Sequence, residues 1–535
     1  MAYVIGVDFG TLSGRAVLVN AENGSIAAQC VADYPHGVDT TQGPGWALQD
    51  PMDYLVVLEK IVPPLLVQAG ILPQEVAGIG WDVTSCTMLP ALADGTPLCN
   101  ALGFEGHPHA RIKLWKHLAA SPQARRIEEA AQGTGLLDRF GGKVSSQWML
   151  PKVLQILEEA PEVYEAADLF LEVADWLTYV LTDSLRRNSC CAGFKAFWEE
   201  ETGYPQEFFT ALDPRLSNLS RKLRGTVLPP WEAAGKLNEE WARRLGLLPG
   251  TLVSAGVIDA HAGLPGSGVA QSGTLLMAMG PSTCHMIFDE KLHTIPAICG
   301  TAKDSVLPGL WAYEAGQACV GDLLDWFVKN QVPARETERA GHEGLDIHQY
   351  LSREASELPP GSGGLLALDW WNGQRSPYVD DRLKGMMLGL TMRTTPAQQY
   401  RALMEATAYG TRLILETFEK GGVAIHDVTA CGGISKKNPL MLQIYADVLG
   451  RPIRIAREEQ TTAFGAAILA AAAAGVHEAP AQAVRAMTAP PEIIYFPDTE
   501  RGAQYDALYA EYRTLAEYFS GINQVMHRLR EKALL

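Results

Sequence analysis

The stretch YVIGVDFGTLSGRAVLVN, residues 3–20, decides the expected fold of this chain. The apolar run from Tyr3 to Val7 predicts a strand, a tight glycine-bearing turn follows, and the run from Arg15 to Asn20 predicts a second strand. Asn23-Gly24 is a hairpin signal that leads into a third strand from Ser25 to Ala32. The amino-terminal segment is therefore predicted to be an antiparallel meander.

A related pattern recurs in the second half of the chain. Thr274 to Met279 and Cys284 to Phe288 are strand-like, and Gly280-Pro-Ser282 forms a turn between them. Two halves that begin alike suggest a duplicated fold. Gly and Ser residues cluster between Gly263 and Gly273, which places the domain boundary near residue 265 and gives domains of residues 1–265 and 266–535.

Between the strands, apolar residues recur at helical spacing, so sheets flanked by helices, an α/β class, are expected. An apolar strand from Leu252 to Ile258 is also predicted. The predicted helices are Pro51 to Ala69, Ile112 to Gln132, Glu158 to Leu181, Thr395 to Lys420, Lys437 to Leu449 and Thr461 to Ala474.

The bulk properties narrow the class of protein. A chain of 535 residues is too long to fold around a single hydrophobic core, so two domains are expected. Its composition, with 47% hydrophobic and 20% charged residues, is typical of a globular protein. A net charge of -17 disfavours nucleic acid and anionic membranes as partners. Nine scattered cysteines without a CxxC pair indicate neither a disulfide framework nor a zinc site. With no basic region at the amino terminus and no long apolar span, a cytoplasmic protein is expected.

The first turn carries groups suited to phosphate. Asp8 ends a strand, and the turn presents backbone N–H groups and the Thr11 and Ser13 hydroxyls, while Arg15 adds positive charge. Asp8 could hold Mg²⁺ directly or through water. A polar hairpin turn with an exposed arginine explains the same residues, and taken alone that explanation is the stronger one.

Two other strand ends carry candidate groups. Asp259 follows an apolar strand and begins a predicted helix, whose amides would favour its charged form; it could accept a proton from a hydroxyl, or it could be a plain helix cap. Gly432 and Gly433 would let a flat or anionic ligand such as adenosine approach the backbone, although a Gly-Gly pair is also common in ordinary βα turns.

Taken in order, residues 8–15, Asp259, residues 280–282 and residues 431–433 resemble the first phosphate motif, the base, the second phosphate motif and the adenosine motif of the FGGY carbohydrate kinases. The resemblance spans most of the chain. It implies two actin-like, ribonuclease-H-like domains, with ATP and a sugar meeting in the cleft between them. Asp259 would then be the catalytic base.

Within that family, several strings are most similar to those of members that phosphorylate L-ribulose. The resemblance implies transfer of phosphate from ATP to the 5-hydroxyl of this ketopentose, a step of arabinose catabolism. The strings are Gly80–Thr87, Lys113–His117, Gly141–Ser146, Ser189–Lys195, Tyr313–Gln317 and Leu368–Gly373.

The same resemblance assigns expected roles to single residues. The sugar would contact Asp82, Ser85, Lys195, Asp259 and Glu314, and Asp8 with Asp259 would lie at Mg²⁺. The nucleotide would contact Thr11, Ser13, Arg15, Gly280, Ser282, Gln317, Gly432, Gly433 and Asn438.

Two residues depart from the family pattern. Pro281 replaces a threonine and removes a hydroxyl and an N–H from the second phosphate motif, where Ser282 or Thr283 could substitute. Ser85 replaces Ala or Gly near the sugar and could change which sugar fits. A kinase for D-ribulose, ribitol or L-xylulose is therefore an alternative, as is a non-catalytic actin-like protein that binds sugar or ATP. A homodimer is left open.

Overall fold

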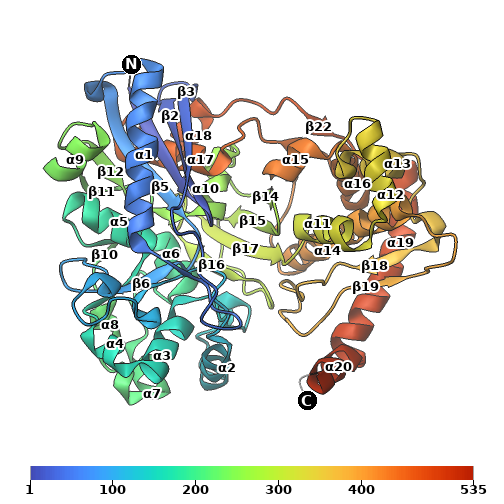
Figure 1. The fold of residues 1–535 in the computed structure, drawn as a ribbon, viewed down its shortest axis with the longest axis horizontal. Coiled ribbons are helices and arrows are strands. Elements are labelled where there is room, and N and C mark those ends of the chain that lie inside the picture. The colour runs from blue at the N-terminus through green and yellow to red at the C-terminus, as the bar shows by residue number, and fades with distance from the viewer. Residues whose placement is uncertain (1, 534–535) are drawn as a thin grey trace.

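The computed structural model describes residues 2–533, which form two α/β halves side by side (Figure 1). The sheet of the first half has the order β11-β12-β5-β1-β2-β3, and β13 also pairs with β5. Its strands are β1 (Tyr3–Phe9), β2 (Ser13–Asn20), β3 (Ile26–Asp33), β5 (Val76–Val83), β11 (Ala233–Lys236), β12 (Leu252–Ser254) and β13 (Val257–Ile258). The predicted meander is confirmed, but the predicted strand Leu252 to Ile258 is two short strands.

The sheet of the second half has the order β16-β17-β15-β14-β20-β21-β22. In both sheets an antiparallel meander continues into parallel strands, so the duplicated α/β fold is confirmed. The strands are β14 (Thr274–Met279), β15 (Thr283–Asp289), β16 (Gly300–Lys303), β17 (Trp311–Gln317), β20 (Asp427–Cys431), β21 (Ile453–Ile455) and β22 (Ile494–Tyr495). A separate pair is formed by β18 (Leu366–Leu368) and β19 (Met386–Leu388).

The first half also carries an insertion around a small sheet of order β4-β7-β6-β8. Here two predicted helices were wrong. The predicted helix Ile112 to Gln132 begins as a strand, β7 (Ile112–Lys113). Only its second part is helical, in α2 (Ser121–Ala130). The stretch Glu158 to Leu181 is interrupted by β8, four buried residues that pair with β6. A short buried apolar run suits a strand and a helix equally well, and pairing with β6 decided between them.

The remaining elements of the first half are mostly short. The strands are β4 (Leu48–Gln49), β6 (Met88–Ala91), β7 (Ile112–Lys113), β8 (Leu169–Glu172), β9 (Arg186–Asn188) and β10 (Thr226–Leu228). The helices are α1 (Pro51–Ala69), α2 (Ser121–Ala130), α3 (Met149–Glu159), α4 (Pro161–Ala166), α5 (Val173–Thr182), α6 (Ser189–Lys195), α7 (Gln206–Leu212), α8 (Leu219–Lys222), α9 (Glu239–Leu245) and α10 (Asp259–Gly266).

One face of the second sheet packs on the core around Leu275, Trp370 and Tyr409. Leu276 on the other face belongs to a second core, which includes Leu264 and Phe464. No helix within residues 2–533 is long and apolar enough to cross a membrane. The helices are α11 (Gly321–Gln331), α12 (Ala334–His342), α13 (Ile347–Ser356), α14 (Pro396–Lys420), α15 (Gly433–Lys437), α16 (Pro439–Leu449), α17 (Thr461–Ala473), α18 (Pro480–Met487), α19 (Thr499–Glu517) and α20 (Val525–Ala533).

Helix α17 joins the two halves, because it lies against α10 and against β1 of the first sheet (Figure 1). The contacts are backbone to backbone. A Cβ on Gly6 would lie 1.9 Å from the carbonyl oxygen of Ala463, and one on Gly465 would lie 1.8 Å from that of Ala262. These positions accept only glycine, since any side chain would force the elements apart.

Candidate active site

Three aspartates meet at one edge of the first sheet. Asp8 on β1 pairs in register with Asp82 on β5, and Val257 of β13 pairs with Asp82 from the other side. Asp259 follows β13 directly and is the first residue of α10. Neighbouring parallel strands therefore deliver the three carboxyl groups together.

Asp82 is completely enclosed, and neither of its carboxyl oxygens has a hydrogen-bond partner among residues 2–533. Burial, and then the neighbouring charge of Asp8, raise the pKa of Asp82 well above its usual range. Both effects favour the protonated, neutral form of its carboxyl group. Because it has no exposed surface, the structure does not place Asp82 on an open sugar site as predicted; it lies beside Asp8 on the neighbouring strand.

Asp259 is half-buried, and its own carboxylate accepts a hydrogen bond from the N–H of Ala260 at 2.7 Å. Burial and then the charge of Asp8 raise its pKa to about 7, although the Ala260 N–H acts in the opposite direction. The Ala260 amide favours the charged form, as expected of the helix amides, but burial and the charge of Asp8 outweigh it. One amide contact does not outweigh burial beside like charges.

The first turn has the predicted groups at its surface. Gly10 N–H donates to the Ser13 carbonyl at 3.0 Å and closes the turn, and the Thr11 and Ser13 side chains are half-buried. Arg15 donates to Asp8 at 3.2 Å, with 41% of its side chain exposed. Asp8 thus neutralises part of the guanidinium charge, and the exposed part of Arg15 can still contact a ligand.

Two residues without a predicted role fix the turn in place. The indole N–H of Trp115 donates to the Thr11 hydroxyl oxygen at 3.0 Å, and the Gln49 amide donates to the Thr11 carbonyl at 2.9 Å. The backbone N–H of Trp115 also donates to Thr87, in the loop that contains Ser85. The sequence shows only that Trp115 belongs to the string Lys113–His117; its contact with Thr11 spans 104 positions.

Lys195 and Glu314 form a buried ion pair between the two halves. Lys195 Nζ lies 2.7 Å from a Glu314 oxygen, and Arg375, which had no predicted role, donates to the other oxygen at 2.5 Å. Burial alone would raise the pKa of Glu314, but Lys195 and Arg375 outweigh it and lower the pKa to about 2. His261 on α10 lies 3.7 Å from the same carboxylate, which places this network next to the helix of Asp259.

Ser85, which is expected at the sugar, is half-buried in a loop between β5 and β6. The next residue, Cys86, has a positive φ of 58°, and the Lys152 ammonium donates to its carbonyl at 2.6 Å. Loop strain of this kind persists only when neighbouring contacts hold it. Lys152 thereby fixes where the Ser85 hydroxyl lies.

The second turn differs from the family pattern at Pro281, which is exposed. Gly280 N–H donates to the Ser282 carbonyl at 2.9 Å, and the Pro281 carbonyl accepts from Val320 and Asp322, where α11 begins. Thr283 is fully buried, so its hydroxyl does not replace the missing one. Ser282, which is half-buried, presents the hydroxyl that remains at the turn.

The proposed adenosine motif lies against this turn. Gly432 has a φ of 92°, and a Cβ there would lie 2.4 Å from the carbonyl oxygen of Met279, so only glycine fits. Gly433 is exposed, with open space where a Cβ would be. A ligand can therefore approach the backbone closely at this point.

Two residues expected at the nucleotide are engaged elsewhere. Gln317 is buried, and its amide donates to Asp369 and to the Thr407 carbonyl, so neither N–H remains for a ligand. Asn438 accepts from the N–H of Met441 and caps α16. Gln317 therefore stabilises the second half, and the Asn438 side-chain oxygen is used by the helix cap; the sequence could not show these partners.

Two family models together match most of the chain. Residues 3–266 match the N-terminal domain and residues 275–474 the C-terminal domain of the FGGY family of carbohydrate kinases. Among curated proteins, the ribulokinases of Geobacillus thermodenitrificans and Mycolicibacterium smegmatis are 48% and 44% identical to it, each over 99% of this chain and 96% of that protein.

Solved structures agree on the fold. A xylulose kinase from Rhodospirillum rubrum superposes with a TM-score of 0.83 at 22% identity, covering 98% of this chain and all of that one. Glycerol kinase of Plasmodium falciparum, solved with ADP, gives a TM-score of 0.78 at 15% identity, with 96% and 98% covered. The two paired sheets described above thus form an actin-like two-domain fold, and the chain belongs to the FGGY family of carbohydrate kinases.

Proposed function

We propose that this enzyme transfers the γ-phosphate of ATP to the 5-hydroxyl of L-ribulose, as a step of arabinose catabolism. The observation that best supports a kinase role is that Asp259, beside the first phosphate turn, has its pKa raised to about 7. The choice of L-ribulose rests on relatives named ribulokinase, which match nearly the full chain.

In the proposed reaction the sugar hydroxyl attacks the γ-phosphorus, and the bond to the β,γ-bridging oxygen breaks as ADP leaves. Asp259 accepts the hydroxyl proton, and the hydroxyls of Thr11 and Ser13 with Arg15 donate to the phosphoryl oxygens as charge develops. Gly280 and Ser282 would face the same phosphates. Lys195 and Glu314, with Ser85, would bind the hydroxyls of the sugar.

Asp8 and Asp259 fit the proposed magnesium site, because carboxylate oxygens are ligands that Mg²⁺ prefers. The charge of Asp8 also raises the pKa of Asp259, and a cation between the two would relieve this repulsion. Residues 2–533 contain no group of three or more His, Cys, Asp or Glu arranged for a metal. That agrees with Mg²⁺ held by one or two carboxylates together with nucleotide phosphates. When bound, the ion neutralises charge on the β- and γ-phosphates.

We further propose that residues 1–265 form the sugar-binding domain with the first phosphate motif, and that residues 266–535 supply the second phosphate motif and the adenosine site. Gly432 and Gly433 support the second assignment, because their backbone is open to a ligand. Cytoplasmic location and a homodimer stay predictions from the sequence.

A coupled assay of ADP release across a panel of sugars tests the proposal. L-ribulose should give the highest kcat/KM, and D-ribulose, L-xylulose and ribitol should rank lower. A preference for one of those three sugars would show that L-ribulose is not the substrate. The departure from the family pattern at Ser85 is the reason for testing them. Sugar binding without any phosphorylated product would instead favour the non-catalytic alternative motivated by Pro281.

The pH dependence of turnover should report the protonation state of Asp259. The base must be unprotonated, and its pKa is raised to about 7, so kcat/KM should fall tenfold per pH unit below that value and level off above it. The profile of kcat/KM for the sugar, measured at constant ionic strength, checks this. A profile that stays flat between about pH 5.5 and 8 would exclude Asp259 as the titrating base.

Replacing Trp115 with phenylalanine should lower kcat about fivefold, because one neutral hydrogen bond of about 1 kcal/mol that orients Thr11 is lost. The indole N–H occupies one lone pair of the Thr11 oxygen, which leaves the O–H to donate to phosphate. Thr11→Val and the double variant complete a mutant cycle. Effects on kcat that simply add in the double variant would show that Trp115 does not act through Thr11.

A further inference from the structure

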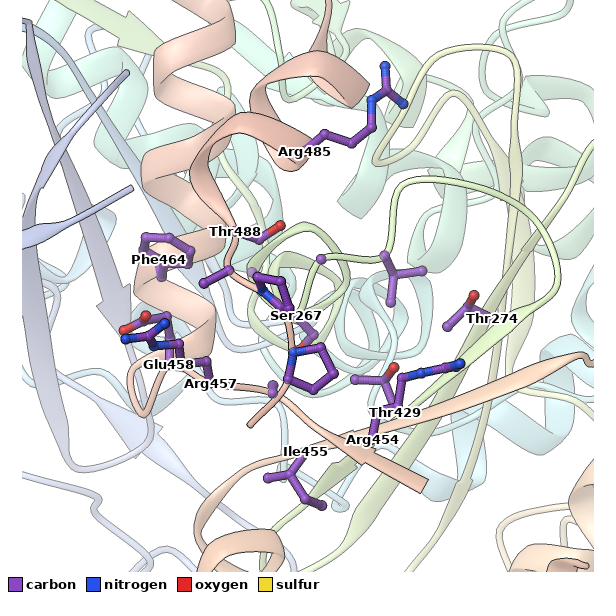
Figure 2. Close-up of a pocket in the computed structure, with 17 residues that line it drawn as sticks. Ser267, Thr274, Thr429, Arg454, Ile455, Arg457, Glu458, Phe464, Arg485 and Thr488 are labelled. Atoms are coloured by element: carbon purple, nitrogen blue, oxygen red, sulfur yellow. The ribbon is translucent and has the colours of Figure 1, made fainter. Parts of the chain in front are cut away.

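A cavity of about 400 Å³ lies beside the segment that links the two halves, away from the three aspartates (Figure 2). One wall is the linker Gly266–Val269, which follows α10. The others are β14, β20 and β21 of the second sheet and the residues around the end of α18. We call it the linker cavity. Its volume is within the range of small-molecule sites.

A row of polar side chains crosses one face of the sheet inside this cavity. Thr429 pairs with Arg454 on β21 and with Leu276 on β14, and Thr274 lies two residues before Leu276. Residues paired across strands, and those two apart along a strand, share a face. Thr274, Thr429 and Arg454 therefore present two hydroxyls and a guanidinium to the same space, as Figure 2 shows.

The lining is positive although the chain carries a net charge of -17. Arg454, Arg457 and Arg485 line the cavity, against the single acidic residue Glu458. Arg454 pairs with Asp427 through one guanidinium nitrogen, and Arg457 pairs with Glu492 at 3.3 Å. Since each contact uses only part of a guanidinium with five N–H donors, donors remain for a ligand.

We propose that the linker cavity binds a small phosphate-bearing anion, separate from the ATP and sugar of the kinase reaction. Guanidinium groups recognise phosphate oxygens through paired N–H donors, and hydroxyls add further bonds. Arg454 with Thr429 and Thr274 forms the binding row, and Arg485 of α18 is also part of the lining.

The place of the cavity gives the ligand a way to affect the enzyme. The linker connects α10, which starts at Asp259, to β14, which ends beside the Gly280 turn. An anion that touches both the linker and the second sheet stabilises one arrangement of these two elements. A ligand alters an equilibrium between arrangements only by its difference in affinity for them, so turnover should change with its concentration.

The test uses the full chain with a saturating non-hydrolysable ATP analogue, so that the nucleotide site is filled, and inorganic pyrophosphate as the probe in calorimetric titration at low salt. We expect saturable binding, weakened about tenfold or more in Arg454→Gln and in Arg485→Gln, because each loses a charged hydrogen-bond donor. Both variants should keep the sugar kinase activity measured without pyrophosphate.

Arg353→Gln, on the exposed face of α13, is the matched control and should bind pyrophosphate like the parent. Binding that survives in both cavity variants, or no binding once the analogue is present, would overturn the proposal. Citrate in place of pyrophosphate separates carboxylates from phosphates: binding of citrate alone would overturn the ligand class.

Discussion

Asp259→Asn is expected to lower kcat by about 10² to 10⁴, the usual contribution of a positioned general base. Asparagine keeps the shape and the contact with Ala260 but cannot take the proton of the sugar hydroxyl. The sugar KM should change little, since the side chain retains hydrogen-bonding atoms at the same place. The coupled ADP-release assay measures both constants, and nucleotide binding by calorimetry should remain.

Asp325→Asn on α11 provides the matched control, since the same chemical change is made at a side chain that is 47% exposed and paired with Lys329. It should leave kcat unchanged. Turnover of Asp259→Asn within a fewfold of the parent would assign the proton acceptor to another group. Loss of nucleotide binding in that variant would instead mean that Asp259 contributes to the phosphate site as a whole.

Glu314→Gln should destabilise the protein by about 3 to 5 kcal/mol, the range for breaking a buried ion pair by removing one partner. The substitution leaves the Lys195 ammonium, which is 3% exposed, and the Arg375 guanidinium without their shared carboxylate. Because Lys195 comes from the first half and Glu314 from the second, the lost ion pair should weaken the contact between the two halves. Sugar-dependent turnover should fall as well.

Lys195→Met is the informative comparison, because it leaves Glu314 paired with Arg375 and removes only the ammonium. Its midpoint of thermal unfolding should therefore lie between those of the parent and Glu314→Gln. Equal midpoints for the parent and Glu314→Gln would show that the network does not stabilise the contact of the two halves.

The local features of this chain could be predicted from its sequence. Helix α1 begins after the cap Asp50 and ends before Gly70 in a left-handed conformation, and its predicted range is the observed one. The first turn was likewise predicted, because its glycines and hydroxyl groups lie next to each other in the chain. Signals of this kind depend on a few neighbouring residues.

Contacts between distant positions could not be predicted. Arg375 reaches Glu314 across 61 positions, and nothing in the string around it indicates a partner. Gln317 lies in a string that resembles the family, yet its amide is used by Asp369 and Thr407 in the core. The direction of the Asp259 pKa shift also depends on Asp8 and on burial, both of which exist only in the folded chain.

The position of α17 limits how the gene could be divided. This helix comes late in the chain, yet it covers β1 and rests on Gly6, so a fragment ending at residue 265 would expose an apolar strand to water. Such a fragment should aggregate when produced alone. It should become soluble when it is co-expressed with the remaining piece, or when α17 is fused to it, because the amino-terminal lobe is completed only by the last third of the polypeptide.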